Sequence, residues 1–237
     1  MRTHRTAALG LVLLAAPATA ATRNFGVQDF DRIRVDGPFR ISLTTGVAPF
    51  AKGSGSTVRL DQVSMEVQGR TLIVRADSSW GGYPGQSNGP VEIAIGTHDL
   101  TSAWVNGSGA LQIDKVKGLG FDLSVQGSGA IGIGEANVDQ LRVSVVGTGS
   151  AFLAGHAGKM TAMVRGVSSL DASSLVTKDA TIGAEGPATV KAQVTNAVNV
   201  NGTGVATIAL TGTPACTVKL SGSASVSGCK QTGSGSY

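Results

Sequence analysis

A glycine pattern at residues 127–132 has the spacing of a dinucleotide-binding turn. Gly127, Gly129 and Gly132 form G-x-G-x-x-G, in which backbone N–H groups can approach a pyrophosphate closely. That chemistry requires a strand before the turn and a helix after it, because the helix N-terminus holds the phosphate. Residues 133–137 are IGEAN, which is typical of a strand end and a turn. The pattern therefore indicates a structural turn rather than a nucleotide site.

A second pattern, Gly85-Gln86-Ser87-Asn88-Gly89, matches the G-x-S-x-G of hydrolases with a serine nucleophile. In those enzymes the serine stands on a sharp turn between a strand and a helix. Here Pro90 and a strand pattern follow, and the surrounding stretch DSSWGGYPGQSNGP has the composition of a turn. We therefore do not expect a serine nucleophile at this position.

Metal-ligating residues are scattered along the chain. The three histidines, His4, His98 and His156, stand singly, and no cluster of His, Cys and Asp has metal-ligand spacing. The G-G-x-G-x-D repeat that binds calcium in β-rolls is also missing. We expect neither a metal nor a cofactor.

Glycines recur in the C-terminal half with a period near 20 residues. The repeats begin NGSGALQI, QGSGAIGI, VGTGSAFL, RGVSSLDA, EGPATVKA, NGTGVATI and SGSASVSG, and their key glycines are 20, 20, 19, 20, 16 and 20 residues apart. Such a period is typical of a solenoid, in which each unit buries its apolar side against the next. The key turn glycines are Gly107, Gly127, Gly147, Gly166, Gly186, Gly202 and Gly222.

Hydrophobic residues alternate with polar ones inside each repeat, as in Phe121, Leu123 and Val125. A period of two is typical of strands, and we find no amphipathic helix pattern after residue 20. Glycine suits the turns because it adopts positive φ without a Cβ penalty. The sequence therefore predicts an all-β protein, a single-domain right-handed parallel β-helix with coils of about 20 residues.

The charged residues of the repeats bear on whether this β-helix is an enzyme. β-Helical lyases and hydrolases need acids and bases grouped on one face. In the predicted register each outward carboxylate instead meets a base across the ladder, which is an ordinary neutralising pair. The pairs expected to stack are Asp122 with Arg142, Asp171 with Lys191, and Arg165 with Glu185. We therefore expect no catalytic residues.

Residues 1–20 have the organisation of a secretory signal peptide. Arg2 and Arg5 precede a short apolar segment, and Ala18-Thr19-Ala20 fits a cleavage site. The apolar segment is too short to span a membrane, and no later stretch reaches about 18 apolar residues. No cysteine lies near the cleavage site, so a lipid anchor is not expected. The expected protein is exported, periplasmic or secreted, without a transmembrane segment.

The charge balance argues against nucleic acid as a partner. The chain has 19 Lys and Arg against 15 Asp and Glu, and loss of Arg2 and Arg5 would leave 17 basic residues and a net charge of +2. This excess is small and scattered, whereas nucleic-acid binding needs a basic patch or stripe.

Residues 21–105 contain alternating strand patterns but lack the glycine period. We expect them to start and cap the solenoid, because an uncovered first coil would expose a strand edge. The glycine-anchored coils would then occupy residues 106–230, and residues 231–237 would form a flexible tail. Trp104, directly before the first clear coil, is expected to fill the core at the cap.

Cys216 and Cys229 are the two cysteines. An even count in an exported protein favours a disulfide. The bond would close a loop of about 14 residues, which contributes roughly 3 kcal/mol in the chain-entropy model. It would fasten the final coil, which has no following coil to hold it.

The longest polar interruption, residues 77–90, carries two aromatic residues, Trp80 and Tyr83. Exposed aromatic side chains on a loop can stack on sugar rings or on a partner protein. The alternative is that they fold over the end of the solenoid. Trp80 and Tyr83 are therefore the candidate ligand-binding residues.

Three segments carry a family resemblance: FDRIRVDGPFRISLTTG, GRTLIVRAD, and PVEIAIGTHDLTSAWVNGSGAL with its recurring GSGA units. Together they resemble the bacterial family called putative auto-transporter adhesin, head GIN domain, over residues 27–228. The resemblance implies an exported β-helix with no catalytic residues to transfer. The expected function is a non-enzymatic envelope or adhesion module that contacts an envelope polysaccharide or a surface protein. The alternative is a carbohydrate-binding or carbohydrate-active β-helix of the lyase or hydrolase kind.

Overall fold

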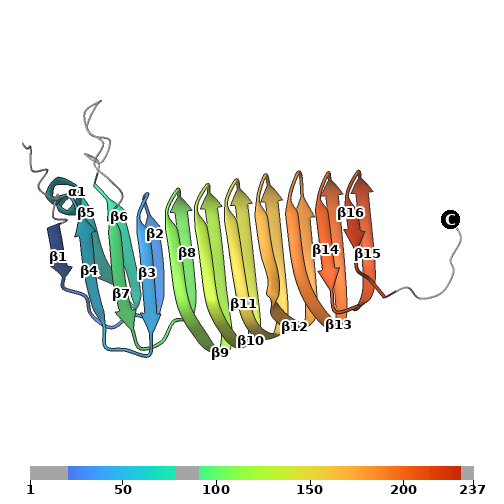
Figure 1. Ribbon diagram of the computed structural model, residues 1–237, viewed down its shortest axis with the longest axis horizontal. Coiled ribbons are helices and arrows are strands. Elements are labelled where there is room, and N and C mark those ends of the chain that lie inside the picture. Colours follow the sequence, from blue (N-terminus) through green and yellow to red (C-terminus); the bar gives the residue numbers. More distant parts are fainter. Residues whose placement is uncertain (1–20, 78–90, 231–237) are drawn as a thin grey trace, which may run out of the picture.

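Residues 21–77 and 91–230 of the protein are described in a computed structural model. They form one 16-stranded sheet that winds into a β-solenoid of about 6 turns (Figure 1). The all-β solenoid predicted from the glycine period is confirmed. The elements are β1 (Ala21–Phe25), β2 (Arg32–Asp36), β3 (Arg40–Thr45), β4 (Phe50–Gly55), α1 (Thr57–Asp61), β5 (Val63–Gln68), β6 (Thr71–Ala76), β7 (Glu92–Thr97), β8 (Ser102–Gly107), β9 (Ala110–Gly127), β10 (Ala130–Gly147), β11 (Ser150–Gly166), β12 (Ser169–Glu185), β13 (Thr189–Gly204), β14 (Thr207–Thr211), β15 (Ala215–Gly222) and β16 (Ser225–Ser227).

The long strands β9 to β13 each make one coil and pair in parallel with their neighbours. Residues 110–113 of β9 pair with β3, whereas residues 122–127 pair with β8, so the two halves of a coil belong to different walls of the solenoid. We call the wall built from β4, β7, β3, the first halves of β9 to β13, β14 and β16 the first face. The second face is built from β5, β6, β2, β8, the second halves of β9 to β13, and β15.

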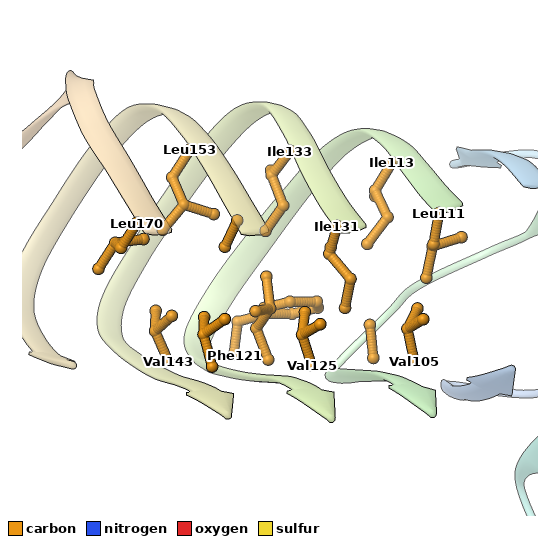
Figure 2. Packing of buried hydrophobic residues seen from close by; sticks show 14 of the residues in the cluster. Val105, Leu111, Ile113, Phe121, Val125, Ile131, Ile133, Val143, Leu153 and Leu170 are labelled. Atoms are coloured by element: carbon orange, nitrogen blue, oxygen red, sulfur yellow. The ribbon is translucent and has the colours of Figure 1, made fainter. Parts of the chain in front are cut away.

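The core lies between the two faces and consists of columns of inward side chains. Figure 2 shows Leu111, Ile131 and Leu170 from the first face opposite Val105 and Val125 from the second. All five are at most 1% exposed, because the coil on either side covers them. Burial of these columns is the dominant favourable contribution to folding. Because side chains alternate between the two sides of a strand, only every second residue faces outward and can take part in a surface site.

The N-terminal strands do not stack in chain order. β2 lies between β6 and β8, and β3 lies between β7 and β9, with all four pairings parallel. In chain order, β2 and β3 come first, and β6 and β7 then pair with them on the side toward the N-terminal end of the solenoid. The chain next returns past β2 and β3 to form β8 on the other side of β2. The backbone N–H of Thr101 donates to the carbonyl of Asp31 at 2.8 Å where the chain crosses.

Antiparallel strands and a short helix cover the N-terminal end of the solenoid. β1 pairs with β4, β4 with β7, and β5 with β6, all antiparallel. In α1, Ser56 caps the N-terminus by accepting from the backbone N–H of Arg59, and Leu60 is buried. This single turn of helix is compatible with the all-β prediction, because five residues are too few to show a 3.6-residue period in the sequence.

One expected turn glycine is misassigned. Gly202 lies inside β13 in register with Ala184 and Leu220, and it is buried. Gly204, with a φ of +77°, makes the turn and pairs with Gly222. The last two spacings are therefore 18 and 18 rather than 16 and 20. The stretch NGTG offers two glycines, and packing decides between them: the Leu220 side chain fills the space beside Gly202.

A disulfide joins Cys216 and Cys229 in the last coil, with a Cα–Cα distance of 5.7 Å. Cys216 belongs to the same inward column as Ala180 and Val198. The expected pairing is therefore present, and it ties β15 to the chain that follows β16.

Candidate functional site

The glycines of the G-x-G-x-x-G pattern are structural. Gly127 makes a turn directly over Gly107, and a Cβ at Gly127 would lie 2.8 Å from the Gly107 carbonyl oxygen. Gly132 lies inside β10, and the Gln112 side chain covers it. A strand follows the pattern where a phosphate site would need a helix.

Two outward carboxylates of the coils, Asp122 and Glu185, pair with bases as the register predicts. An Arg142 guanidinium nitrogen lies 3.2 Å from an Asp122 oxygen, and the Arg165 Nε lies 2.9 Å from a Glu185 oxygen. Among residues 21–77 and 91–230, no three His, Cys, Asp or Glu side chains gather into a possible metal site.

Asp171 is the acid of the third expected pair, and Lys191 lies beside it in the ladder. It accepts hydrogen bonds from the hydroxyl and the backbone N–H of Ser173. These hydrogen bonds hold the pKa of Asp171 below its usual range. A carboxyl group held ionised in this way does not suit the role of a general acid.

The histidines and the loop aromatics do not assemble a site in the described residues. The His98 Nδ1 lies 3.1 Å from an Asp29 carboxylate oxygen, and His156 is exposed. Trp80 and Tyr83 lie outside the described residues, so their role in ligand binding stays a prediction.

Trp104 points outward from the second face and is half-buried, so its expected role as a core cap is wrong. Its neighbours Ala103 and Val105 fill the core and are fully buried. Strand alternation then places Trp104 on the outward side of β8, the side that also carries Ser102 and Asn106. In the sequence, the polar residues Ser102 and Asn106 two positions on either side of Trp104 could have indicated that Trp104 faces outward.

A hollow of about 510 Å³ lies beside Trp104, over β5, β6 and β2. Arg34 stands between Ile73 and Trp104 in the ladder, but its Nε donates to Asp36 at 2.9 Å, which turns the side chain aside. Asn106 Nδ2 donates to the same Asp36 oxygen at 2.7 Å. Asp36 therefore holds the Arg34 and Asn106 side chains in place at the edge of the hollow before any ligand binds. The hollow is lined by Arg34, Gln68, Thr71, Ile73, Trp104, Asn106 and Gln126.

A second hollow, of about 260 Å³, lies on the other side of Trp104 over β9 to β11. Ser124 and Ser144 are small, so they leave a low floor between Trp104 and Met163 along the ladder. The Asp122–Arg142 ion pair borders this floor. We call Trp104 and the side chains that line these two hollows the Trp104 surface.

The sequence profile of the family described as "putative auto-transporter adhesin, head GIN domain" matches residues 29–214. No curated protein matches the chain. Among the described residues, no helix is long and apolar enough to cross a membrane.

Solved structures share the fold over nearly the whole chain. A putative adhesin from Bacteroides fragilis matches with a TM-score of 0.76 and 20% identity, covering 90% of this chain and 95% of that one. A putative lipid binding protein from Parabacteroides distasonis matches with a TM-score of 0.70 and 20% identity, covering 89% and 96%. A putative adhesin from Parabacteroides merdae matches with a TM-score of 0.65 and 16% identity, covering 89% and 96%. At these identities the likeness establishes the fold alone.

Proposed function

Because the chain belongs to the family described as putative auto-transporter adhesin, head GIN domain, we propose that it is a non-enzymatic adhesion module that binds saccharide at the Trp104 surface. The observation that carries the proposal is the outward, half-buried indole of Trp104, which stands between two hollows with polar walls. The expected signal peptide at residues 1–20 and the adhesin family both support a place in the cell envelope or outside the cell.

A sugar chain fits the chemistry of the Trp104 surface. Each sugar ring presents an apolar face of C–H groups, which an indole can stack against, and an edge of hydroxyl groups. Gln68, Asn106 and Gln126 each carry an amide that supplies both a donor and an acceptor. Since the two hollows lie in line across the strands, we expect a linear oligosaccharide rather than a single sugar.

Binding without turnover follows from the charges near the indole. The Asp122 carboxylate is paired with Arg142, and Asp36 is held by Arg34 and Asn106. Glycoside cleavage needs two carboxyl groups placed on either side of one bond. In the described part of the chain, Asp122 and Asp36 are committed to these partners instead, and Glu66, the cross-strand neighbour of Ile73, accepts a hydrogen bond from Gln68 Nε2 at 3.1 Å.

The test is titration with neutral hexasaccharides of glucose, mannose and N-acetylglucosamine. Trp80→Phe leaves Trp104 as the one tryptophan, so a change in its emission reports binding directly. We expect at least one of the three to change that emission. In calorimetric titrations, which need no tryptophan, we expect Trp104→Ala to weaken its binding at least tenfold, and Trp104→Phe to retain part of it.

The matched control is the Trp80→Ala/Tyr83→Ala variant, which substitutes no residue of the Trp104 surface. Loss of binding in that variant, with normal binding by Trp104→Ala, would move the site to residues 77–90. Release of reducing sugar from any probe would contradict the non-enzymatic assignment. Circular dichroism of each variant verifies that the fold is intact.

A further inference from the structure

The first face carries a trough of about 780 Å³. It crosses β4, β7, β3, β9, β10 and β11, and its floor is made of small outward side chains. Five steps between neighbouring strands separate Lys52 at one end from Phe152 at the other, which is about 24 Å. The floor consists of Ser42, Ala94, Ala110, Ala130 and Gly132.

The trough results from a local choice of small residues. In the ladder that holds Gly132, the following coils carry Phe152, Asp171 and Lys191. Gln112 lies flat across Gly132, because its amide oxygen occupies the place that a Cβ would take. Phe152 is 54% exposed and rises at the end of the floor. The trough therefore joins a low floor to an exposed aromatic ring.

The other end of the trough is basic. Arg40 and Lys52 line it, together with one acid, Glu92, which is the cross-strand neighbour of Arg40. Neither Arg40 nor Lys52 makes an ion pair within 4.0 Å of an acidic group in the described residues. Two cations against one carboxylate leave an excess positive charge that an anionic ligand would neutralise.

We infer that this trough is a second saccharide site, on the face opposite the Trp104 surface, and that it binds an acidic linear polysaccharide. Phe152 offers an aromatic face for a sugar ring, and Gln112 supplies an amide donor and acceptor. Arg40 and Lys52 bind uronate carboxylates. The trough is long, shallow and open at the surface, which suits a chain passing across the strands. This inference goes beyond the proposed function, because its ligand is selected by charge.

The probe is hexagalacturonate, with the neutral galactose hexamer of equal length as the matched ligand. We expect the acidic hexamer to bind more tightly, and its affinity to fall as salt rises from 50 to about 300 mM, because screening shortens the reach of exposed charges. The Arg40→Gln/Lys52→Gln variant should bind it at least tenfold more weakly and lose most of the salt dependence. Phe152→Ala should also weaken binding.

Lys191→Gln is the matched control, since Lys191 lies in the same ladder but outside the trough, and it should bind as the unaltered protein does. Trp104→Ala should retain hexagalacturonate binding, so this test stands even if the proposed function fails. Equal binding of both hexamers, or an unaltered affinity in the double variant, would overturn the inference. Binding of phosphatidylglycerol vesicles without hexagalacturonate binding would assign the trough to anionic lipid instead.

Discussion

At the scale of single residues, the side of a strand on which a residue falls decides its role. Ala103 and Val105 are buried in the core, whereas Trp104 between them lies on the outward side, although tryptophan has the largest apolar side chain of the three. Asp36 acts through its position as well, because it holds Arg34 at 2.9 Å and Asn106 at 2.7 Å beside the indole.

Asp171 gives a residue-scale prediction of pH dependence. Hydrogen bonds from Ser173 lower the pKa of Asp171 in the native state. The resulting stabilisation is fully present above the unfolded pKa of about 3.9, and it is lost as the pH falls through the lower native pKa. Asp171→Asn should therefore be less stable than the unaltered protein at pH 7, and the gap should narrow below about pH 4.

Urea unfolding at pH 7, 5 and 3, followed by circular dichroism, measures that gap. Ser173→Ala is the companion variant, because it removes the hydroxyl donor and should remove part of the same pH dependence. A gap that stays constant from pH 7 to pH 3 would contradict the assigned role of these hydrogen bonds.

At the scale of the element, the coil turns depend on glycine for two separable reasons. One is the positive φ, such as +84° at Gly166 and +78° at Gly186. The other is contact with the coil below, since a Cβ at Gly166 would lie 2.5 Å from the Gly147 carbonyl oxygen. At Gly186 the nearest atoms would be 3.7 Å away, which is ordinary van der Waals contact.

Alanine substitution should separate these two reasons. Gly186→Ala should cost about 1–2 kcal/mol of unfolding free energy, because only the left-handed backbone is strained. Gly166→Ala should cost about 3 kcal/mol, because it adds a backbone clash to the same strain. Urea unfolding of the two variants gives the comparison. Equal losses would show that stacking distance between turns has no energetic role.

At the scale of the whole molecule, the two ends of the solenoid differ. The N-terminal end is covered by antiparallel strands and α1. In the described residues no strand pairs beyond β15, and its inward Val218 is 38% exposed, whereas Val200 one coil earlier is 1% exposed. The last coil is therefore held from one side only, and the Cys216–Cys229 bond supplies an added constraint.

Removing that bond should loosen the last coil selectively. Cys216→Ser/Cys229→Ser should lose about 3 kcal/mol, because the disulfide closes a loop of about 14 residues in the unfolded chain. Hydrogen exchange followed by mass spectrometry should show faster exchange in β15 and β16. Exchange in β9 to β11 serves as the internal control and should be unaltered at short times. Uniform acceleration along the whole solenoid would contradict a local role for the disulfide.

The sequence by itself determined the solenoid, its strand alternation and the pairing of Asp122 with Arg142 and Arg165 with Glu185. These features repeat at a near-constant interval, so each coil predicts the next, and inward side chains must recur with a period of two. The repeat failed at Gly202, where two glycines compete for one turn and contact with Leu220 decides the register.

Only the tertiary structure decided the order of the N-terminal strands and the location of both hollows. β2 pairs with strands from two distant parts of the chain, and no local pattern specifies such pairing. The Trp104 surface combines residues from β2, β5, β6 and β8 to β11, and the trough combines β4, β7 and β3 with β9 to β11. A hollow exists where small side chains on neighbouring strands coincide, and that coincidence is a property of strand pairing, which acts over long range, rather than of local sequence.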